Sequence, residues 1–146
     1  MALPTGSGTE TLHAHQFVDV DGGQKLILGI QHHVYTVLSI IIYCNALNAI
    51  TDVCILRMVC HDGHAGTSAA EPVLALANPQ VNETWVWNDK FSFNGVEPTG
   101  TNVFSAAEQI AIAAQSGSAV QSLEVSPTNA GDDYDIFVTY LDQDWT

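Results

Sequence analysis

The chain has 146 residues, of which 47% are hydrophobic and 13% charged, so intrinsic disorder is excluded and a single domain is expected. Sixteen Asp and Glu residues stand against three Lys and Arg residues, giving a formal net charge of −13. Binding to nucleic acid or to an anionic membrane requires several basic side chains at one place, and Lys25, Arg57 and Lys90 are far apart in the chain, so neither partner is expected.

Residues 1–10 are expected to form an N-terminal arm ahead of a single domain over residues 11–146. The segment MALPTGSGT is small and polar and contains Pro and Gly, a composition typical of irregular chain. It has neither the basic region nor the apolar core of a signal peptide, and the three cysteines are an odd number, so folding in a cytoplasm is expected. An arm of this kind is expected to contact a neighbouring subunit, and Leu3, Pro4 and Thr5 are its candidate interface residues.

From residue 11 onward, apolar and polar residues alternate with a period close to two, which indicates β-strands rather than helices. The strongest runs are rich in β-branched and aromatic residues, as central strands are. After a first strand in this region, the expected strands are 25–30, 34–43, 53–60, 84–93, 108–115, 119–125 and 134–142. The best helix candidate, residues 68–77, is interrupted by Pro72.

About eight short strands, separated by turns rich in Gly, Asn, Asp and Pro, predict an all-β fold. This pattern favours a two-sheet β-sandwich of the jelly-roll or Greek-key type. The two inner faces of such a sandwich must be filled, and the aliphatic runs at 34–43, 53–60 and 134–141 are expected to fill them.

Three stretches of this chain resemble small β-sandwich structural proteins of tailed bacteriophages, especially marine and cyanobacterial phages. They are VYTVLSIIIYCN, TWVWNDKF, and AAEQIAIAAQSGSAV with the later VTYLDQDW. The resemblance spans roughly residues 34–142 and is broken between Val120 and Tyr134 by the insertion QSLEVSPTNAGDD. It implies a non-enzymatic protein of the virion, without a cofactor: a capsid decoration (cement) protein that binds and stabilises the shell. A tail or head-fibre module that recognises a glycan of the host surface is the alternative.

The low content of charged residues indicates protein partners. A soluble domain of this size normally carries more Lys, Glu and Arg on its surface, so part of this surface is expected to be covered by other subunits. The resemblance implies the major capsid protein or other virion proteins as partners, and a homo-oligomer, taken here as a trimer. A monomer kept soluble by hydroxyl and amide groups is the alternative.

Two segments contain residue types that bind metals. The segment Cys60–His64 (CHDGH) offers thiolate, imidazole and carboxylate donors for Zn²⁺, but no second pair of ligands occurs at a typical spacing. Asp132, Asp133 and Asp135 could supply oxygens to Ca²⁺, although their spacing does not fit an EF-hand. For both segments we expect polar turns without a metal.

The chain contains none of the common motifs for nucleophilic catalysis or nucleotide binding. The patterns G-x-S-x-G, G-x-x-x-x-G-K-[ST] and G-x-G-x-x-G are all missing from it. We therefore do not expect an enzyme.

His13 and His15 are two residues apart, so on a strand their side chains share one face. They are candidate interface residues. Six histidines in a chain of net charge −13 could make subunit contacts sensitive to pH, because imidazole titrates near neutrality. Polar contacts without a switching role are the alternative.

Trp85 and Trp87 also share a face on their expected strand. They could form a stacking platform for a glycan, or they could pack within the core, which we favour. Trp145 lies one residue from the C-terminus, where a core position is difficult, so we expect it to dock against a neighbour as a further candidate interface residue.

Overall fold

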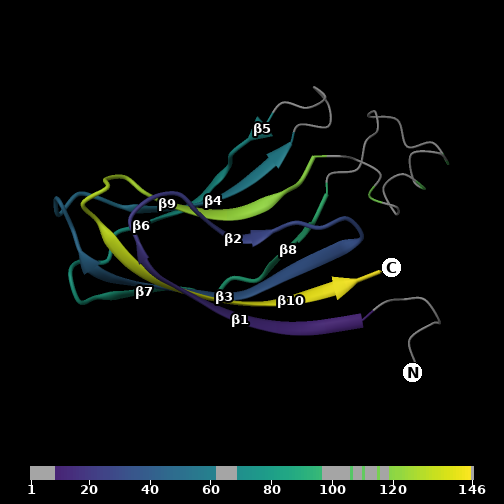
Figure 1. The fold of residues 1–146 in the computed structure, drawn as a ribbon, viewed down its shortest axis with the longest axis horizontal. Helices are drawn as coiled ribbons and strands as arrows, with labels where there is room; N and C mark the ends of the chain where they lie inside the picture. The colour runs from purple at the N-terminus through teal and green to yellow at the C-terminus, as the bar shows by residue number, and fades with distance from the viewer. Residues whose placement is uncertain are drawn as a thin grey trace.

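The structure is a computed structural model, and it describes residues 9–61, 69–96 and 119–145 together with Ala106, Ile110 and Gln115. The described residues form two antiparallel sheets that pack face to face as a β-sandwich (Figure 1). This confirms the all-β class expected from the sequence. No helix in the described part of the chain is long and apolar enough to cross a membrane.

The first sheet, sheet A, has β1, β10 and β3 as its long strands. Its strands are β1 (Thr9–Val20), β10 (Asp133–Asp144), β3 (His33–Ala46), β7 (Thr84–Trp87) and β8 (Phe91–Asn94). β7 and β8 pair end to end with the same strand, β3. They replace the single strand expected over 84–93, because the chain leaves the sheet between them, where the Trp87 indole donates a hydrogen bond to the Asp89 carbonyl at 2.7 Å.

The second sheet, sheet B, is built in the same way. Its strands are β2 (Gln24–Leu28), β9 (Ser122–Pro127), β4 (Cys54–His61), β5 (Ala69–Ala70) and β6 (Val73–Ala77). β5 and β6 both pair with β4. Pro72 lies between them and has no N–H for the ladder, while its carbonyl accepts a hydrogen bond from the Met58 backbone N at 3.1 Å.

The order of the strands is that of a jelly roll. If β5 with β6 and β7 with β8 each count as one interrupted strand, each sheet of the described chain contains four strands. Their orders are β1-β10-β3-β7/β8 and β2-β9-β4-β5/β6. Early strands lie beside late ones, which is the double Greek-key arrangement of this fold. The expected two-sheet topology is therefore confirmed. The count of eight includes β5 with β6, which lie in the segment 68–77, the best helix candidate in the sequence, and does not include the strand expected over 108–115.

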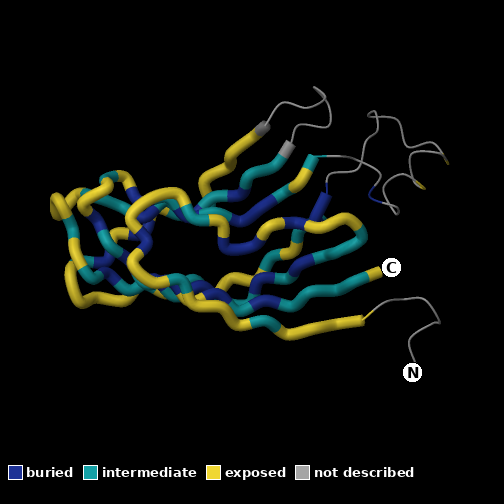
Figure 2. The backbone as a smooth tube through the Cα atoms, viewed as in Figure 1, coloured by how far each residue is buried: buried dark blue, intermediate teal, exposed yellow. Residues whose placement is uncertain are grey.

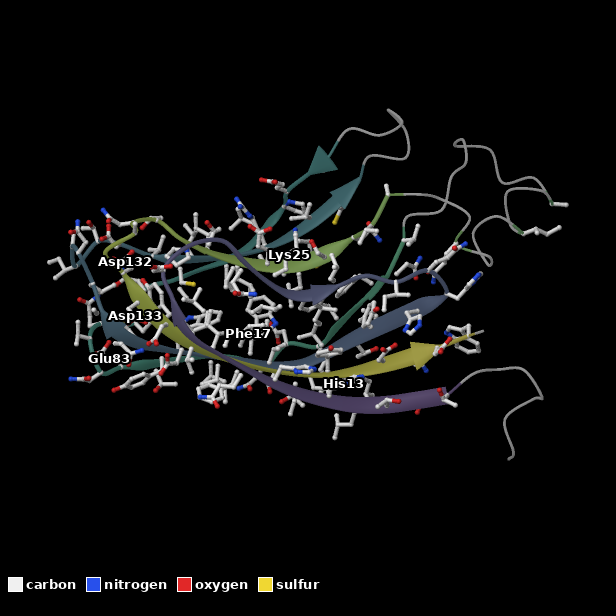
Figure 3. All side chains as sticks on the ribbon, viewed as in Figure 1. His13, Phe17, Lys25, Glu83, Asp132 and Asp133 are labelled. Carbon is white, nitrogen blue, oxygen red and sulfur yellow. The ribbon has the colours of Figure 1, made fainter. Side chains whose placement is uncertain are left out.

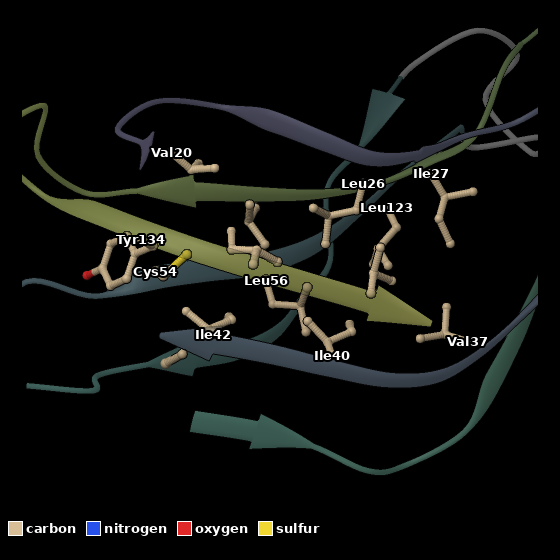
Figure 4. Close-up of a cluster of buried hydrophobic side chains, with 14 of the residues drawn as sticks. Val20, Leu26, Ile27, Val37, Ile40, Ile42, Cys54, Leu56, Leu123 and Tyr134 are labelled. Atoms are coloured by element: carbon tan, nitrogen blue, oxygen red, sulfur yellow. The ribbon is translucent and has the colours of Figure 1, made fainter. Parts of the chain in front are cut away.

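The core lies between the sheets and comes mainly from the predicted aliphatic runs. Ile40 and Ile42 of β3, Ile136 of β10, Leu56 of β4 and Leu123 of β9 are all completely buried. Figure 4 shows such side chains from both sheets meeting in one cluster. Burying each of these side chains stabilises the fold by about 1.5–3 kcal/mol.

Two of the predicted segments lie partly outside the described residues. β1 begins at Thr9, within the segment expected to be the arm, while Leu3, Pro4 and Thr5 lie outside the described residues. Of the strand expected over 108–115, the structure describes only Ile110 and Gln115, and neither lies in a strand.

Candidate functional site

His13 and His15 lie on β1, the edge strand of sheet A, and their rings stack. His13 is in register with Tyr140 of β10, and His15 with Val138. The two imidazole centroids are 5.5 Å apart, and the His13 and Tyr140 rings are 5.0 Å apart. Because Val138 and Tyr140 are buried between the sheets, both histidines belong to the inner face of sheet A. The prediction that they share a face is confirmed.

Asp142 of β10 connects His13 with a third histidine, His33, at the start of β3. The Asp142 carboxylate lies 2.7 Å from His33 Nδ1 and 3.8 Å from His13 Nε2. Asp144 approaches the other ring nitrogen of His33 at 3.7 Å. We call His13, His15, His33, Asp142 and Asp144 the histidine–aspartate cluster. Figure 3 shows His13 on β1, nearer to the end of the sandwich where β1 begins and β10 ends.

Tyr35 and Tyr140 pack against the histidine rings of this cluster on its buried side. The Tyr35 and Tyr140 rings are 5.9 Å apart in an edge-on arrangement. Burial, and next the neighbouring Asp142 carboxylate, raises the pKa of Tyr35 to about 12 and also raises the pKa of Tyr140. Both phenols are therefore neutral near pH 7 and contribute rings and hydroxyl groups rather than charge.

The cluster combines ring surfaces with imidazole and carboxylate groups at an open strand edge. His15 is exposed, the His13 side chain is about one third exposed, and Asp142 is largely covered. Imidazole can donate or accept a hydrogen bond, and aromatic rings offer apolar area. This arrangement suits contact with a polar group that carries an apolar face, from a neighbouring subunit or from a sugar.

The outer face of sheet A is uncharged over three rows of cross-strand neighbours. Phe137, Thr139 and Leu141 alternate with the buried residues of β10 and so point away from the core. The rows are Leu12-Leu141-Thr36-Ser92, Ala14-Thr139-Ser39 and Gln16-Phe137-Ile41-Val86. We call these residues the uncharged outer face. Along β1 and β10 the next ionisable residues are Glu10 beyond one end and Asp135 beyond the other. Asp89 and Lys90 lie at the edge of the sheet, in the connection between β7 and β8.

Several apolar side chains of this face are open to solvent. Leu12 is 63% exposed, Val86 47% and Phe137 38%. Figure 2 shows β1 exposed along most of its length, as the outermost strand of its sheet. The low content of charged residues seen in the composition is thus evident on this outer face. Sequence reasoning did not find this surface, because the strands whose residues form it are distant in the sequence, and alternation within one strand does not show which strands are neighbours.

Trp85 and Trp87 lie on the inner face of sheet A, opposite the uncharged outer face. They are in register with Ile42 and Ile40, and both are half-buried against the core. The prediction that they share a face is confirmed, and their position favours packing over glycan stacking. Trp145 is 47% exposed, and its backbone N donates a hydrogen bond to the His32 carbonyl at 2.9 Å.

The aspartates considered for Ca²⁺ do not form one group. Asp133 and Asp135 lie on the outer side with Asp19, their carboxylate oxygens all within 4.8 Å of one another, whereas Asp132 is 1% exposed. A bulge in β1 between Phe17 and Val20 gives Asp19 a φ of 56° and brings it to this position. Its contribution could not be read from spacing along the chain.

The cysteine and histidine candidates are only partly described. Asp62, Gly63 and His64 lie outside the described residues, as does the side chain of His61, so the CHDGH segment has no geometry here. Cys44 and Cys54 are completely buried, as expected for packed thiols. Burial, and next the nearby Asp132, raises the pKa of Cys54 to about 12.

Comparison with known proteins gives no relative. No family model, curated protein or solved structure matches the chain, so function is inferred from the residues and surfaces described above.

Proposed function

We propose that this chain is a non-enzymatic structural protein of a bacteriophage virion, a capsid decoration (cement) protein that binds the shell surface and stabilises it. The observation that carries the proposal is the uncharged outer face of sheet A on a chain of net charge −13. The resemblance of three segments to phage β-sandwich proteins supports the same assignment.

The uncharged outer face is the surface that another subunit can cover at the lowest cost. Burying an unpaired carboxylate is expensive, so a strongly acidic protein is best approached where it has no ionisable group. Leu12, Phe137 and Val86 supply exposed apolar area in the two outer rows, on either side of a middle row that contains Thr139 and Ser39. Apolar side chains mixed with uncharged polar ones, and few charges, are typical of specific protein interfaces.

β1 pairs only with β10 among the described strands, and its other edge supports the proposal independently of this face. An edge strand presents unpaired backbone N–H and C=O groups, and natural proteins usually block it with Lys, Pro or a bulge. β1 has a bulge near Asp19, but it carries no Lys or Pro between Thr9 and Phe17. A strand of a neighbouring subunit could therefore add to sheet A along this edge.

The fold is compatible with the proposal but does not decide it. Jelly rolls occur in viral capsid proteins and also in lectins and cupins, so fold alone cannot assign a function. A protein that binds only the assembled shell shifts the assembly equilibrium toward it by mass action. No catalytic step is needed for this role.

A substitution on the uncharged outer face tests the proposal. Phe137→Glu places a charge within the uncharged outer face, and we expect it to weaken binding to shells at least tenfold, measured by co-sedimentation. Leu76→Glu is the matched control, because Leu76 is 60% exposed but lies on β6 of sheet B. Equal binding of both variants would show that this face is not the contact.

The alternative is a tail or head-fibre module that binds a host glycan. The feature that favours it is the His13, His15 and Tyr140 ring stack beside Asp142, since sugars stack on rings and bond to carboxylates. Quantitative gel electrophoresis of virions separates the two roles by copy number. Hundreds of copies per particle support a shell protein, and a handful support a tail or fibre protein.

A further inference from the structure

Asp132 is a buried carboxylate at the end of the sandwich where β10 begins (Figure 3). It lies just before β10, and its Oδ1 accepts a hydrogen bond from the Asn48 backbone N at 2.9 Å. Its second oxygen, Oδ2, has no donor among the described residues. A buried carboxylate oxygen without a donor needs a hydrogen-bond donor, a proton or a cation as its partner.

The side chain beside this carboxylate is a second acid. Asp52, from the loop between β3 and β4, is within side-chain hydrogen-bonding reach of Asp132, and its Oδ2 accepts a hydrogen bond from the Ala49 backbone N at 2.8 Å. Two carboxylates are both acceptors, so their contact requires a proton or a cation between them. No ion pair joins either acid to Lys, Arg or His in the described chain, and Lys25 and Arg57 are both bound to Glu124 in sheet B.

An independent group at the same place also lacks a partner. The Tyr134 side chain is completely buried, and its hydroxyl has no hydrogen-bond partner among the described residues. Burial raises the pKa of Tyr134, and the neighbouring Asp132 carboxylate raises it next. A carboxylate oxygen and a phenol oxygen are thus both buried and unsatisfied close to one another.

We propose that Asp52 and Asp132 bind a hard divalent cation, Ca²⁺, between the loop at 46–53 and the loop at 128–132. The carboxylates of the two loops offer oxygen donors, which Ca²⁺ prefers. Burial, and next the nearby Asp132, raises the pKa of the neighbouring Cys44 and Cys54 thiols, so these thiols stay protonated near pH 7 and offer no thiolate to a soft metal. Ca²⁺ accepts irregular sets of carboxylate and water ligands, whereas Mg²⁺ demands near-ideal octahedral geometry. The site is distinct from the trio Asp19, Asp133 and Asp135 on the outer side, because Asp132 faces the interior.

The cation binds the folded state and not the unfolded state, so it raises the thermal stability of the protein. With a dissociation constant of about 0.1–1 mM, 10 mM CaCl₂ should raise Tm by about 4–8 °C relative to chelator. Asp132→Asn should abolish this rise, because the amide replaces a charged ligand and can donate to Asp52. Terbium luminescence, sensitised by nearby aromatic rings, should report direct binding in the wild type and be lost in the variant.

Asp135→Asn is the matched control, since it makes the same change in the trio on the outer side, and it should keep the full rise. If Asp132→Asn does not fold, Asp52→Asn takes its place. No rise in the wild type would overturn the proposal in favour of a buried proton or water. A rise kept in Asp132→Asn and lost in Asp135→Asn would assign the cation to the trio, and an equal rise in all variants would indicate general screening of negative charge.

Discussion

Glu124 is the residue on which two of the three basic side chains converge. Its Oε1 lies 3.0 Å from Arg57 Nη2, and its Oε2 lies 3.3 Å from Lys25 Nζ. Burial alone raises the pKa of Glu124, but the hydrogen bonds and charges of Arg57 and Lys25 outweigh it and hold the pKa below its ordinary value. These contacts join β2, β9 and β4 across sheet B, so they stabilise the ionised form of Glu124 together with the fold.

Glu124→Gln should lower the free energy of unfolding by about 1–2 kcal/mol at pH 7. A depressed folded pKa gives stability that is present above the unfolded value, about 4.3, and is lost as the pH falls through the folded value. The difference between wild type and variant should therefore vanish toward pH 3. Urea denaturation at the two pH values measures it.

Glu71→Gln is the control for this change. Glu71 also pairs with Arg57, at 3.4 Å, but its side chain is 50% exposed, so solvent screens the pair and we expect a change below about 0.5 kcal/mol. Equal losses from the two substitutions, or a Glu124→Gln loss that persists at pH 3, would contradict the assignment.

At the scale of the elements, Gly29, which follows β2, and Gly95, which follows β8, allow the backbones of the two sheets to approach closely. A Cβ on Gly29 would lie 2.0 Å from the Gly95 carbonyl oxygen, and a Cβ on Gly95 would lie 2.0 Å from the Ile30 carbonyl oxygen. The Gly29 N donates to the Gln121 carbonyl at 2.8 Å, and the Gln121 N donates to the Gly95 carbonyl at 3.0 Å. The backbones of three segments therefore meet with no room for a side chain.

Gly95→Ala should destabilise the protein by about 2–3 kcal/mol, because the added methyl group meets backbone that cannot move aside. Gly22→Ala is the control, since nothing lies within 4 Å of a Cβ there, and its effect should stay within about 0.5 kcal/mol. Thermal or urea unfolding of both variants is the measurement. If the Gly95 variant is as stable as the Gly22 variant, the contact is looser than described.

The long strands could be predicted because each buries one face in the core, which requires an apolar residue at every second position. The runs at 34–43, 53–60 and 134–142 correspond to β3, β4 and β10, whose inner residues fill the core. The ends of the short strands are set by places where the chain locally leaves the sheet. The alternation of apolar and polar residues over 84–93 does not show that this segment is divided into β7 and β8. The first strand begins at Thr9, before the alternation that starts at residue 11, because these residues pair with β10.

The candidate sites were harder to predict than the elements. A period of two correctly placed His13 and His15 on one face. It could not place Asp142 between His13 and His33, because that contact depends on β10 lying between β1 and β3. The acid pair of Asp52 and Asp132 likewise joins two loops that are distant in the sequence.

At the scale of the whole molecule, like charge opposes every contact between copies. A net charge of −13 produces repulsion that extends over about 30 Å at 0.01 M salt and about 3 Å at 1 M salt. If copies or shells meet through the uncharged outer face, added salt should strengthen their association.

Raising NaCl from 0.01 M to 0.5 M should therefore increase self-association in analytical ultracentrifugation, because repulsion is screened and no attractive ion pair is lost. Phe137→Glu should reduce the association at each salt concentration. Association that weakens with salt would instead indicate contacts between opposite charges.

The position of the last two strands has a consequence for how the chain reaches its native state. β9 lies between β2 and β4, and β10 lies between β1 and β3, so the centre of each sheet is made from the final quarter of the sequence. Pairings between such distant segments fold slowly, as in other proteins of high contact order. During synthesis, the apolar strand β3 is made long before its main neighbour β10, and it is exposed to aggregation until β10 has been made.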